Sequence, residues 1–181
     1  ALFEAVEGCL AVGVSWLTVY AFSTENWRRP KDEVKFLLNF NRDLLRRRRD
    51  ELNERGVRIR FIGRRNWRVP RGVLREMEDA EQLTRSNRKL TLNIAFNYGG
   101  RAELVDAVSS IVDSGVRADR VNEALIAKHL YDPSMPDPEL MIRTSGESRV
   151  SNFLMWQLAY TEMIFSDVLW PDFTRDHVYG A

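Results

Sequence analysis

The sequence predicts an α/β fold, in which a parallel β-sheet is flanked by helices within a single domain. Short apolar segments rich in β-branched and aromatic residues alternate with longer amphipathic segments along the chain. Repeated strand–helix units of this kind need crossover connections, which produce a parallel sheet with helices on both faces. The 181 residues are a normal length for one domain, and no repeat or linker divides them.

The first third of the chain predicts a helix, a strand and a longer helix. Residues 1–12 have apolar side chains near helical spacing, and Gly13 can end that helix. The apolar segment 16–22 has the residues of a buried parallel strand. After a polar turn, Pro30 suits the first position of a helix of about 25 residues, and Gly56 ends it.

The rest of the chain repeats this alternation with shorter elements. Pro-rich residues 132–138 form a loop, and Ser151 is a suitable N-cap for the last of these helices. Ligands of parallel sheets bind beyond the carboxyl ends of the strands, which nominates the loops 23–29, 97–101 and 143–151. The further strands are expected at 57–62, 90–96, 140–142 and 163–165, and the helices at 70–86, 100–112, 120–130 and 151–160.

Composition argues against several classes of protein. No apolar run approaches the roughly 18 residues of a membrane span, and no signal peptide is recognisable, so we expect a cytoplasmic protein. The single cysteine, Cys9, cannot form an internal disulfide, and we expect it to be buried in the first helix. Two histidines, His129 and His177, are too few for a His/Cys metal site.

The charge pattern does not favour nucleic acid as a partner. The net charge is only +1, and the run Arg46–Arg49 points in several directions if it lies on a helix. Acidic residues three or four positions away can pair with these arginines. They are Asp43, Asp50, Glu51 and Glu54. We therefore interpret the run as a solvated, ion-paired helix surface.

The turn at 22–30, FSTENWRRP, is the first segment suited to binding an anion. It follows a strand and precedes a helix, so backbone N–H groups and the positive end of the helix are available. Asn26 can donate and accept hydrogen bonds, Arg29 can pair with phosphate, and Trp27 offers a flat apolar face. The alternative is an ordinary capped turn with Trp27 in the core.

The segment at 142–153, IRTSGESRVSNF, is the second segment suited to binding an anion. Arg143, Arg149, the Ser151 hydroxyl and the N-terminus of the following helix can converge on one diphosphate. The alternative is a solvated loop whose arginines pair with Glu147 or Asp137.

Glu162 is a lone carboxylate among apolar residues of the segment at 156–173. Next to a diphosphate it can hold Mg²⁺, because that ion takes few protein ligands and completes its shell with water and phosphate oxygens. The alternative is an ordinary surface glutamate.

Four segments together resemble the cis-prenyltransferase family, which includes the undecaprenyl and decaprenyl diphosphate synthases. The resemblance covers nearly the whole chain and implies one catalytic domain, a homodimer and a hydrophobic tunnel for the growing isoprenoid. It also implies Mg²⁺ as cofactor, isopentenyl diphosphate and an allylic prenyl diphosphate as substrates, and membrane contact through the lipid product. The segments are YAFSTENWRRP, NIAFNYGGR, IRTSGESRVSNF and WQLAYTEMIFSDVLWPDF.

The resemblance also implies roles for the residues that match the family's motifs. Arg143, Arg149 and Ser151 match the residues that bind isopentenyl diphosphate, and Glu162 matches the Mg²⁺-binding glutamate. The remaining matches lie in the first turn. Ser23, Asn26 and Trp27 match residues at the reacting end of the allylic substrate, with Asn26 linked to proton removal, and Arg29 matches a residue of the same turn.

The sequence departs from the family pattern at three places. It lacks the opening Asp-Gly-Asn-Gly-Arg-Trp-like loop and the closing Arg-x-Gly tail, and Ser148 stands where many relatives have histidine. We expect these residues to be part of a longer protein. A non-catalytic supporting subunit and a relative that couples two dimethylallyl units remain alternatives. The small residue Ala21, at the end of the strand that lines the tunnel, favours a medium or long product.

Overall fold

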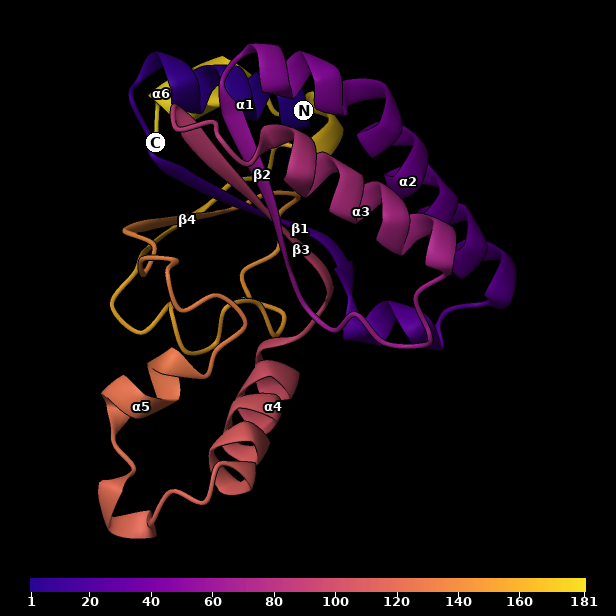
Figure 1. Cartoon of the computed structure of the whole chain (residues 1–181). Coiled ribbons are helices and arrows are strands. Elements are labelled where there is room, and N and C mark those ends of the chain that lie inside the picture. The colour runs from indigo at the N-terminus through magenta and orange to yellow at the C-terminus, as the bar shows by residue number, and fades with distance from the viewer.

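A parallel three-stranded sheet forms the centre of the structure, a computed structural model that describes residues 1–181 (Figure 1). The strands are β1 (Trp16–Ser23), β2 (Val57–Ile62) and β3 (Leu90–Tyr98), in the order β1–β3–β2. β3 is hydrogen-bonded on both sides and is buried along almost its whole length. This position explains its nearly continuous apolar sequence, LTLNIAFNY.

Three helices cover one face of this sheet. They are α1 (Leu2–Ala11), α2 (Lys31–Glu54) and α3 (Arg71–Thr84), and α2 and α3 run side by side (Figure 1). Their apolar stripes pack on the side chains that all three strands direct to this face, with Val6, Leu52 and Ala80 at 0–3% exposure. Burial of these apolar surfaces is the main force that holds the layers together.

The other face of the sheet carries loops and a small second sheet rather than the helices that the sequence predicts there. The second sheet pairs β4 (Leu140–Arg143) with β5 (Glu162–Phe165) in parallel. Ile62 and Ala95 pack against residues of this region, including Leu154. Helices α4 (Gly100–Asp113) and α5 (Glu123–Lys128) extend away from the sheet, and α6 (Arg175–Tyr179) packs on α1 (Figure 1).

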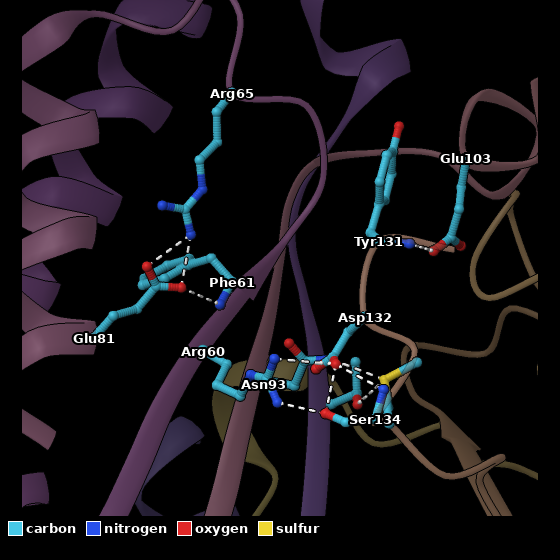
Figure 2. Close-up of polar contacts among 11 residues, drawn as sticks. Arg60, Phe61, Arg65, Glu81, Asn93, Glu103, Tyr131, Asp132 and Ser134 are labelled. Carbon is cyan, nitrogen blue, oxygen red and sulfur yellow. Dashed lines mark hydrogen bonds and ion pairs between the residues drawn. The ribbon is translucent and has the colours of Figure 1, made fainter. Parts of the chain in front are cut away.

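A polar network fixes the Pro-rich loop to the second face of the sheet (Figure 2). Asp132, which is 6% exposed, accepts hydrogen bonds from the Ser134 hydroxyl at 2.6 Å and forms an ion pair with Arg60 at 3.0 Å. Arg60 lies opposite Asn93 of β3 in the sheet, and Asn93 donates to the sulfur of Met135 at 2.9 Å. The loop that leads into β4 is therefore attached to the central strands.

All five predicted strands are confirmed to within two residues at each end. The predicted helix at 151–160 is wrong, because this segment forms a series of turns. Ser151, Asn152 and Leu154 have φ values of 50°, 61° and 42°, which a right-handed helix does not allow. Ser151 is therefore not an N-cap. The helix α6 and three short 3₁₀ helices were not predicted: η1 (Thr24–Arg28), η2 (Ala118–Arg120) and η3 (Trp170–Asp172).

One expectation from composition agrees with the structure. Cys9 is buried at 5% exposure, and burial raises the pKa of its thiol. None of the helices has both the length and the apolar character that crossing a membrane requires.

The arginine run on α2 is ion-paired only in part. Arg48 pairs with Glu51 as expected, whereas Arg49 pairs with Glu76 and Asp79 of α3. Arg46 and Arg47 are exposed and have no ion pair. The run therefore does not form one basic patch.

Gly63, just after β2, provides a test of how closely β2 and β3 approach. Its φ is +125°, and a Cβ atom built there lies 2.0 Å from the Phe96 carbonyl oxygen. We expect Gly63→Ala to destabilise the fold by about 3 kcal/mol or more, because a backbone oxygen cannot move aside.

Urea unfolding followed by circular dichroism measures this effect. Gly72→Ala in α3 is the control, since a Cβ there meets no atom within 4 Å. It should leave the stability unchanged or raise it by up to about 1 kcal/mol. Equal stabilities of the two variants would show that the approach at Gly63 is not a constraint.

Candidate functional site

The three loops nominated by the sequence meet at the carboxyl ends of β1, β3 and β4. Asn152 joins them, since its amide nitrogen donates to Glu25 at 2.8 Å and its amide oxygen accepts from the Arg101 N–H at 2.8 Å. The Asn152 carbonyl also accepts from the Gly100 N–H at 2.7 Å. The loop rule for parallel sheets therefore identified segments that are in contact.

The double glycine after β3 allows this close contact. A Cβ at Gly99 would lie 2.5 Å from the Thr24 hydroxyl oxygen and 2.8 Å from the Asn152 amide nitrogen. A Cβ at Gly100 would lie 2.5 Å from the Met155 side chain. Larger residues at these positions would separate the loops, so the glycines are required by packing.

Ser23 and Asn26 hold the turn after β1 in one conformation. The Asn26 amide oxygen accepts from the Ser23 N–H at 2.8 Å, and the Ser23 hydroxyl accepts from the Asn26 N–H at 3.3 Å. This reciprocal capping box starts the 3₁₀ helix η1. The Asn26 amide nitrogen has no partner in the chain, so it can donate to a ligand.

Trp27 connects this turn to the end of β3. Its indole N–H donates to the Asn97 amide oxygen at 2.7 Å, and its ring lies edge-on to Phe22 at 5.0 Å. Asn97, with a φ of 50°, in turn donates to the Arg64 carbonyl at 2.7 Å. Trp27 is thus a packed and hydrogen-bonded residue, as the alternative from the sequence stated, at the edge of the site.

Arg143 is the last residue of β4, and its side chain has an unusual environment. Its Nε–H is buried and has no hydrogen-bond partner in the chain. A buried donor without an acceptor is costly, and such groups often mark ligand sites. Arg149 is largely exposed, at 71% for its side chain, and pairs only with Glu147 at 2.7 Å. Ser151 lies in the same loop, where its hydroxyl has no partner.

Two predicted residues lie apart from this group. Arg29 is exposed and pairs with Glu33 one turn along α2. Glu162 is exposed at the start of β5, opposite Leu140, whereas Arg143 is opposite Phe165. Three positions along a strand correspond to about 10 Å, so Glu162 and Arg143 lie at opposite ends of the small sheet.

The carboxylate predicted to hold Mg²⁺, Glu162, stands alone in the structure. No group of three or more His, Cys, Asp or Glu side chains is arranged to hold a metal ion. Glu162 is a single carboxylate, and an Mg²⁺ ion held by it would complete its shell with water and phosphate oxygens.

An apolar cavity lies between the sheet and its helices, with about 600 Å³ of free space including its open side. Thirteen of its 16 lining residues are hydrophobic. They come from α1, α2, α3 and all three strands, and extend from Leu2 and Leu52 to Ala21 and Phe96. Ala21 and Phe96 lie two residues before the ends of β1 and β3, so the cavity reaches the loop region.

Glu103 is a residue that the sequence did not suggest. Its carboxylate, 1% exposed, accepts from the Tyr98 hydroxyl at 2.5 Å, the Tyr131 N–H at 3.0 Å and the Gln157 amide at 3.2 Å. Figure 2 shows the contact with Tyr131. Burial, and then the Glu103 charge, raise the pKa of Tyr98. Glu103 thereby joins β3, α4 and the two segments that flank β4.

Arg64 and Asp106 form a second connection at this edge. Two guanidinium nitrogens of Arg64 donate to the Asp106 carboxylate at 2.8 and 2.7 Å, and the Tyr131 hydroxyl donates to it at 2.5 Å. The hydrogen bonds from Arg64, more than that from Tyr131, lower the pKa of Asp106 despite partial burial.

Arginine side chains at the carboxyl edge of a parallel sheet, beside an apolar cavity, are features suited to a ligand that has an anionic group attached to a hydrocarbon. Comparison with known families is more specific. The family model described as "Putative undecaprenyl diphosphate synthase" matches residues 1–181. The chain belongs to this family.

Curated relatives agree with this assignment. The chain is 53% identical to a trans,polycis-polyprenyl diphosphate synthase, (2Z,6E)-farnesyl diphosphate specific, of Thermobifida fusca, over 99% of the chain and 65% of the relative. It is 48% identical to the decaprenyl diphosphate synthase of Mycolicibacterium smegmatis, over 99% of the chain and 62% of the relative. The chain thus spans somewhat less than two thirds of the length of these two relatives.

Solved structures share the fold. A probable undecaprenyl diphosphate synthase from Campylobacter jejuni matches with a TM-score of 0.90 and 32% identity, over 99% of this chain and 84% of that one. Lavandulyl diphosphate synthase from Lavandula x intermedia, in complex with dimethylallyl diphosphate, matches with a TM-score of 0.91 and 33% identity, over 98% and 78%. The predicted parallel sheet flanked by helices is confirmed.

The Arg64–Asp106 pair predicts how stability depends on pH. Because the pKa of Asp106 is lower in the folded state, its contribution is present above the unfolded pKa of about 3.9 and is lost as the pH falls below it. We expect Asp106→Asn to cost about 1 kcal/mol at pH 7, a value reduced for its 37% exposed side chain.

Urea unfolding at pH 7 and at pH 3 tests this effect, and the difference between the variant and the parent should shrink at pH 3. Asp119→Asn is the control, since Asp119 pairs with Arg117 on the surface. A constant difference across this pH range would mean that the ionised pair does not contribute.

Proposed function

We propose that this protein is a cis-prenyltransferase, which joins isopentenyl diphosphate to an allylic prenyl diphosphate and forms a cis double bond. The product is a medium- or long-chain polyprenyl diphosphate. The observation that carries the proposal is the buried, unpartnered Arg143 Nε–H, at the carboxyl edge of a sheet whose apolar cavity can hold a hydrocarbon. Membership of the prenyltransferase family supports the same reaction.

The reaction follows from the chemistry of the two substrates. The bond between the allylic carbon and its diphosphate breaks, and the electron pair leaves with inorganic diphosphate. The double bond of isopentenyl diphosphate supplies the electrons of the new carbon–carbon bond. A proton then leaves the carbon next to the new cationic centre, which creates the cis double bond. The products are the lengthened diphosphate, inorganic diphosphate and a proton.

Arg143, Arg149 and Ser151 would hold isopentenyl diphosphate. Arginine suits this role because its planar donors match phosphate oxygens, and Arg149 can exchange its exposed contact with Glu147 for a ligand. The Ser151 hydroxyl, which has no partner in the chain, is a further donor. No helix N-terminus contributes here, because the segment at 151–160 is not helical.

The turn after β1 would orient the reacting end of the allylic substrate. The capping box with Ser23 fixes the Asn26 carboxamide, and its free amide nitrogen can donate to a diphosphate oxygen near the proton that leaves. Trp27 keeps the turn against β3 through Asn97. Arg29 has a smaller part in this proposal, because it pairs with Glu33 at the surface.

The family resemblance adds Mg²⁺ with Glu162 as its ligand. Glu162 would hold the ion together with water and diphosphate oxygens, and the ion would supply positive charge where the leaving diphosphate becomes more negative. The role of Glu162 is a question for metal-dependence measurements on the Glu162→Gln variant.

A homodimer and contact with membranes are further parts of the proposal. Large apolar side chains are exposed on and beside the small sheet, among them Tyr160 at 98%, Met163 at 41% and Phe165 at 47%. Such a surface suits a subunit interface. A polyprenyl product would bring a cytoplasmic enzyme to the membrane surface.

Two alternatives remain testable by the same product analysis. A supporting subunit would have no reason to retain an unpartnered buried arginine, which argues against that reading. Coupling of two dimethylallyl units is not separated from chain elongation by the fold, since lavandulyl diphosphate synthase and the undecaprenyl-type synthase match with nearly equal TM-scores.

The first test is a product assay with farnesyl diphosphate, labelled isopentenyl diphosphate and Mg²⁺, resolved by chain length. We expect elongated product, and a fall of about 10- to 100-fold in kcat/KM for isopentenyl diphosphate in Arg143→Ala, because a charge-assisted contact is lost. Arg117→Ala is the control, because the Arg117 side chain is 81% exposed and lies outside the three loops of the proposed site. An active Arg143→Ala enzyme with unchanged kcat/KM would refute the assignment of Arg143.

A second test concerns product length. Ala21 lines the cavity, and a leucine there would occupy space that a growing chain needs. We expect Ala21→Leu to shift the product distribution to shorter chains. The total turnover of isopentenyl diphosphate should fall by a smaller factor than the yield of long chains. Ala118→Leu, at an exposed position outside the cavity, should leave the distribution unchanged. An unaltered distribution in Ala21→Leu would show that the cavity does not hold the product.

A further inference from the structure

Tyr20, near the end of β1, lies on the second face of the sheet, opposite the apolar cavity. Its neighbours Val19 and Ala21 line that cavity, so the alternation of side chains along a strand directs Tyr20 to the face that carries the loops. Tyr20 is paired with Ala95 of β3, and the register of β1 shifts directly after it. Irregularities of this kind redirect side chains and are common beside functional sites.

The ring of Tyr20 stacks on the ring of Phe153. The ring centroids are 4.7 Å apart and the planes differ by 19°. Phe153 comes two positions after Ser151, at the end of the loop that contains Arg143 and Arg149. A side chain that is fixed in the central sheet therefore contacts the far end of the proposed isopentenyl diphosphate loop.

The hydroxyl of Tyr20 fixes the orientation of this ring. It donates to the Tyr98 carbonyl at 3.1 Å. The Tyr98 ring, at 0% exposure, lies edge-on to Tyr20 and to Phe153, with centroid distances of 6.0 and 6.2 Å. The Tyr98 hydroxyl is in turn held by Glu103. The three rings thus form one aromatic cluster that joins β1, β3 and the segment after the loop.

The charges of the proposed site act on the Tyr20 phenol. Burial, and then the Glu25 charge, raise the pKa of Tyr20, while Ser23 and Arg143 oppose the rise. The phenol therefore lies within electrostatic reach of both loops. Because no group of the chain accepts from the buried Arg143 Nε–H, the position of Arg143 depends on how the surrounding loop is packed.

The two halves of the loop are attached to different parts of the molecule. Ser145 and Gly146, in the first half, donate their N–H groups to carbonyls of the segment after β5, at 2.8 and 3.0 Å. Arg149 lies in the second half, which is followed by the polar contacts of Asn152 and the aromatic contacts of Phe153. Removal of the stack would free one end of the loop and leave the other end attached.

We propose that Tyr20 is a positioning residue for isopentenyl diphosphate, because its ring holds Phe153 and thereby the loop that carries Arg143 and Arg149. This inference rests on the function proposed for that loop. Tyr20 does not need to touch the substrate. A loop held in one conformation loses less conformational entropy when a diphosphate binds, so the stack should strengthen binding of that substrate.

Hydrogen–deuterium exchange of the ligand-free protein tests the positioning role independently of the reaction. Tyr20→Leu and Phe153→Leu each remove one ring, whereas Tyr20→Phe keeps the ring and removes only the hydroxyl. We expect the amides of residues 144–153 to exchange about 5-fold faster in both leucine variants. In Tyr20→Phe their exchange should stay within about 2-fold of the parent.

Ile111→Ala is the control for a general loss of stability. Ile111 is buried at 4% exposure in α4 and lies outside the three loops of the proposed site. This variant should be destabilised without a selective change at 144–153. If Tyr20→Leu does not fold, Phe153→Leu provides the same test from the other side of the stack.

Steady-state kinetics with farnesyl diphosphate and labelled isopentenyl diphosphate tests the consequence for binding. We expect KM for isopentenyl diphosphate to rise about 10-fold in Tyr20→Leu and in Phe153→Leu, while kcat and KM for farnesyl diphosphate change by less than about 3-fold. Tyr20→Phe should restore a KM near that of the parent. The double leucine variant should be no worse than the more affected single variant, because the two rings act as a pair.

The outcomes separate this inference from the proposed reaction. Selectively faster exchange at 144–153 in a parent protein that makes no elongated product would support the positioning role and contradict the reaction. Unchanged exchange there, or an equal increase in Ile111→Ala, would overturn the positioning role. An active Tyr20→Leu enzyme whose KM for isopentenyl diphosphate equals that of the parent would overturn it as well.

Discussion

The parallel pairing of β3 with both β1 and β2 is the constraint on which the rest of the structure depends. Because β3 is central and buried, its register with its neighbours places the ends of β1 and β3 side by side, with Ser23 opposite Tyr98. The Ser23–Asn26 turn and the Gly99–Gly100 step therefore meet at one edge. On the helical face, the same strands present the apolar side chains that line the cavity.

Polar contacts at that edge connect elements that are distant in the sequence. Asn152 links two loops to the segment after β4, and the buried carboxylate of Glu103 links β3 and α4 to both flanks of β4. Such fully hydrogen-bonded groups orient the loops at low cost, whereas a single missing partner would be expensive. Four buried side-chain polar atoms lack a partner, and the Arg143 Nε–H, which carries the functional proposal, is the only donor among them.

The helices α2 and α3 border two cavities, and the side chains that line them differ in polarity. Their inner sides line an apolar space suited to a hydrocarbon, while an open groove between the starts of the two helices is lined by Lys31 and Lys35 of α2 and by Gly72 and Val73 of α3. Val73 and Arg42 border both spaces.

The sequence alone determined the strands, the longer helices and the family, because apolar periodicity and long matching segments are local properties of the chain. It also nominated three loops that the structure brings into contact, since the carboxyl-end rule needs only strand order. Only the tertiary structure decided that 151–160 is not helical, because contacts from Arg101 and Gly100 to Asn152 favour positive φ values there. It alone separated Glu162 from Arg143, because strand register is set by pairing between distant segments.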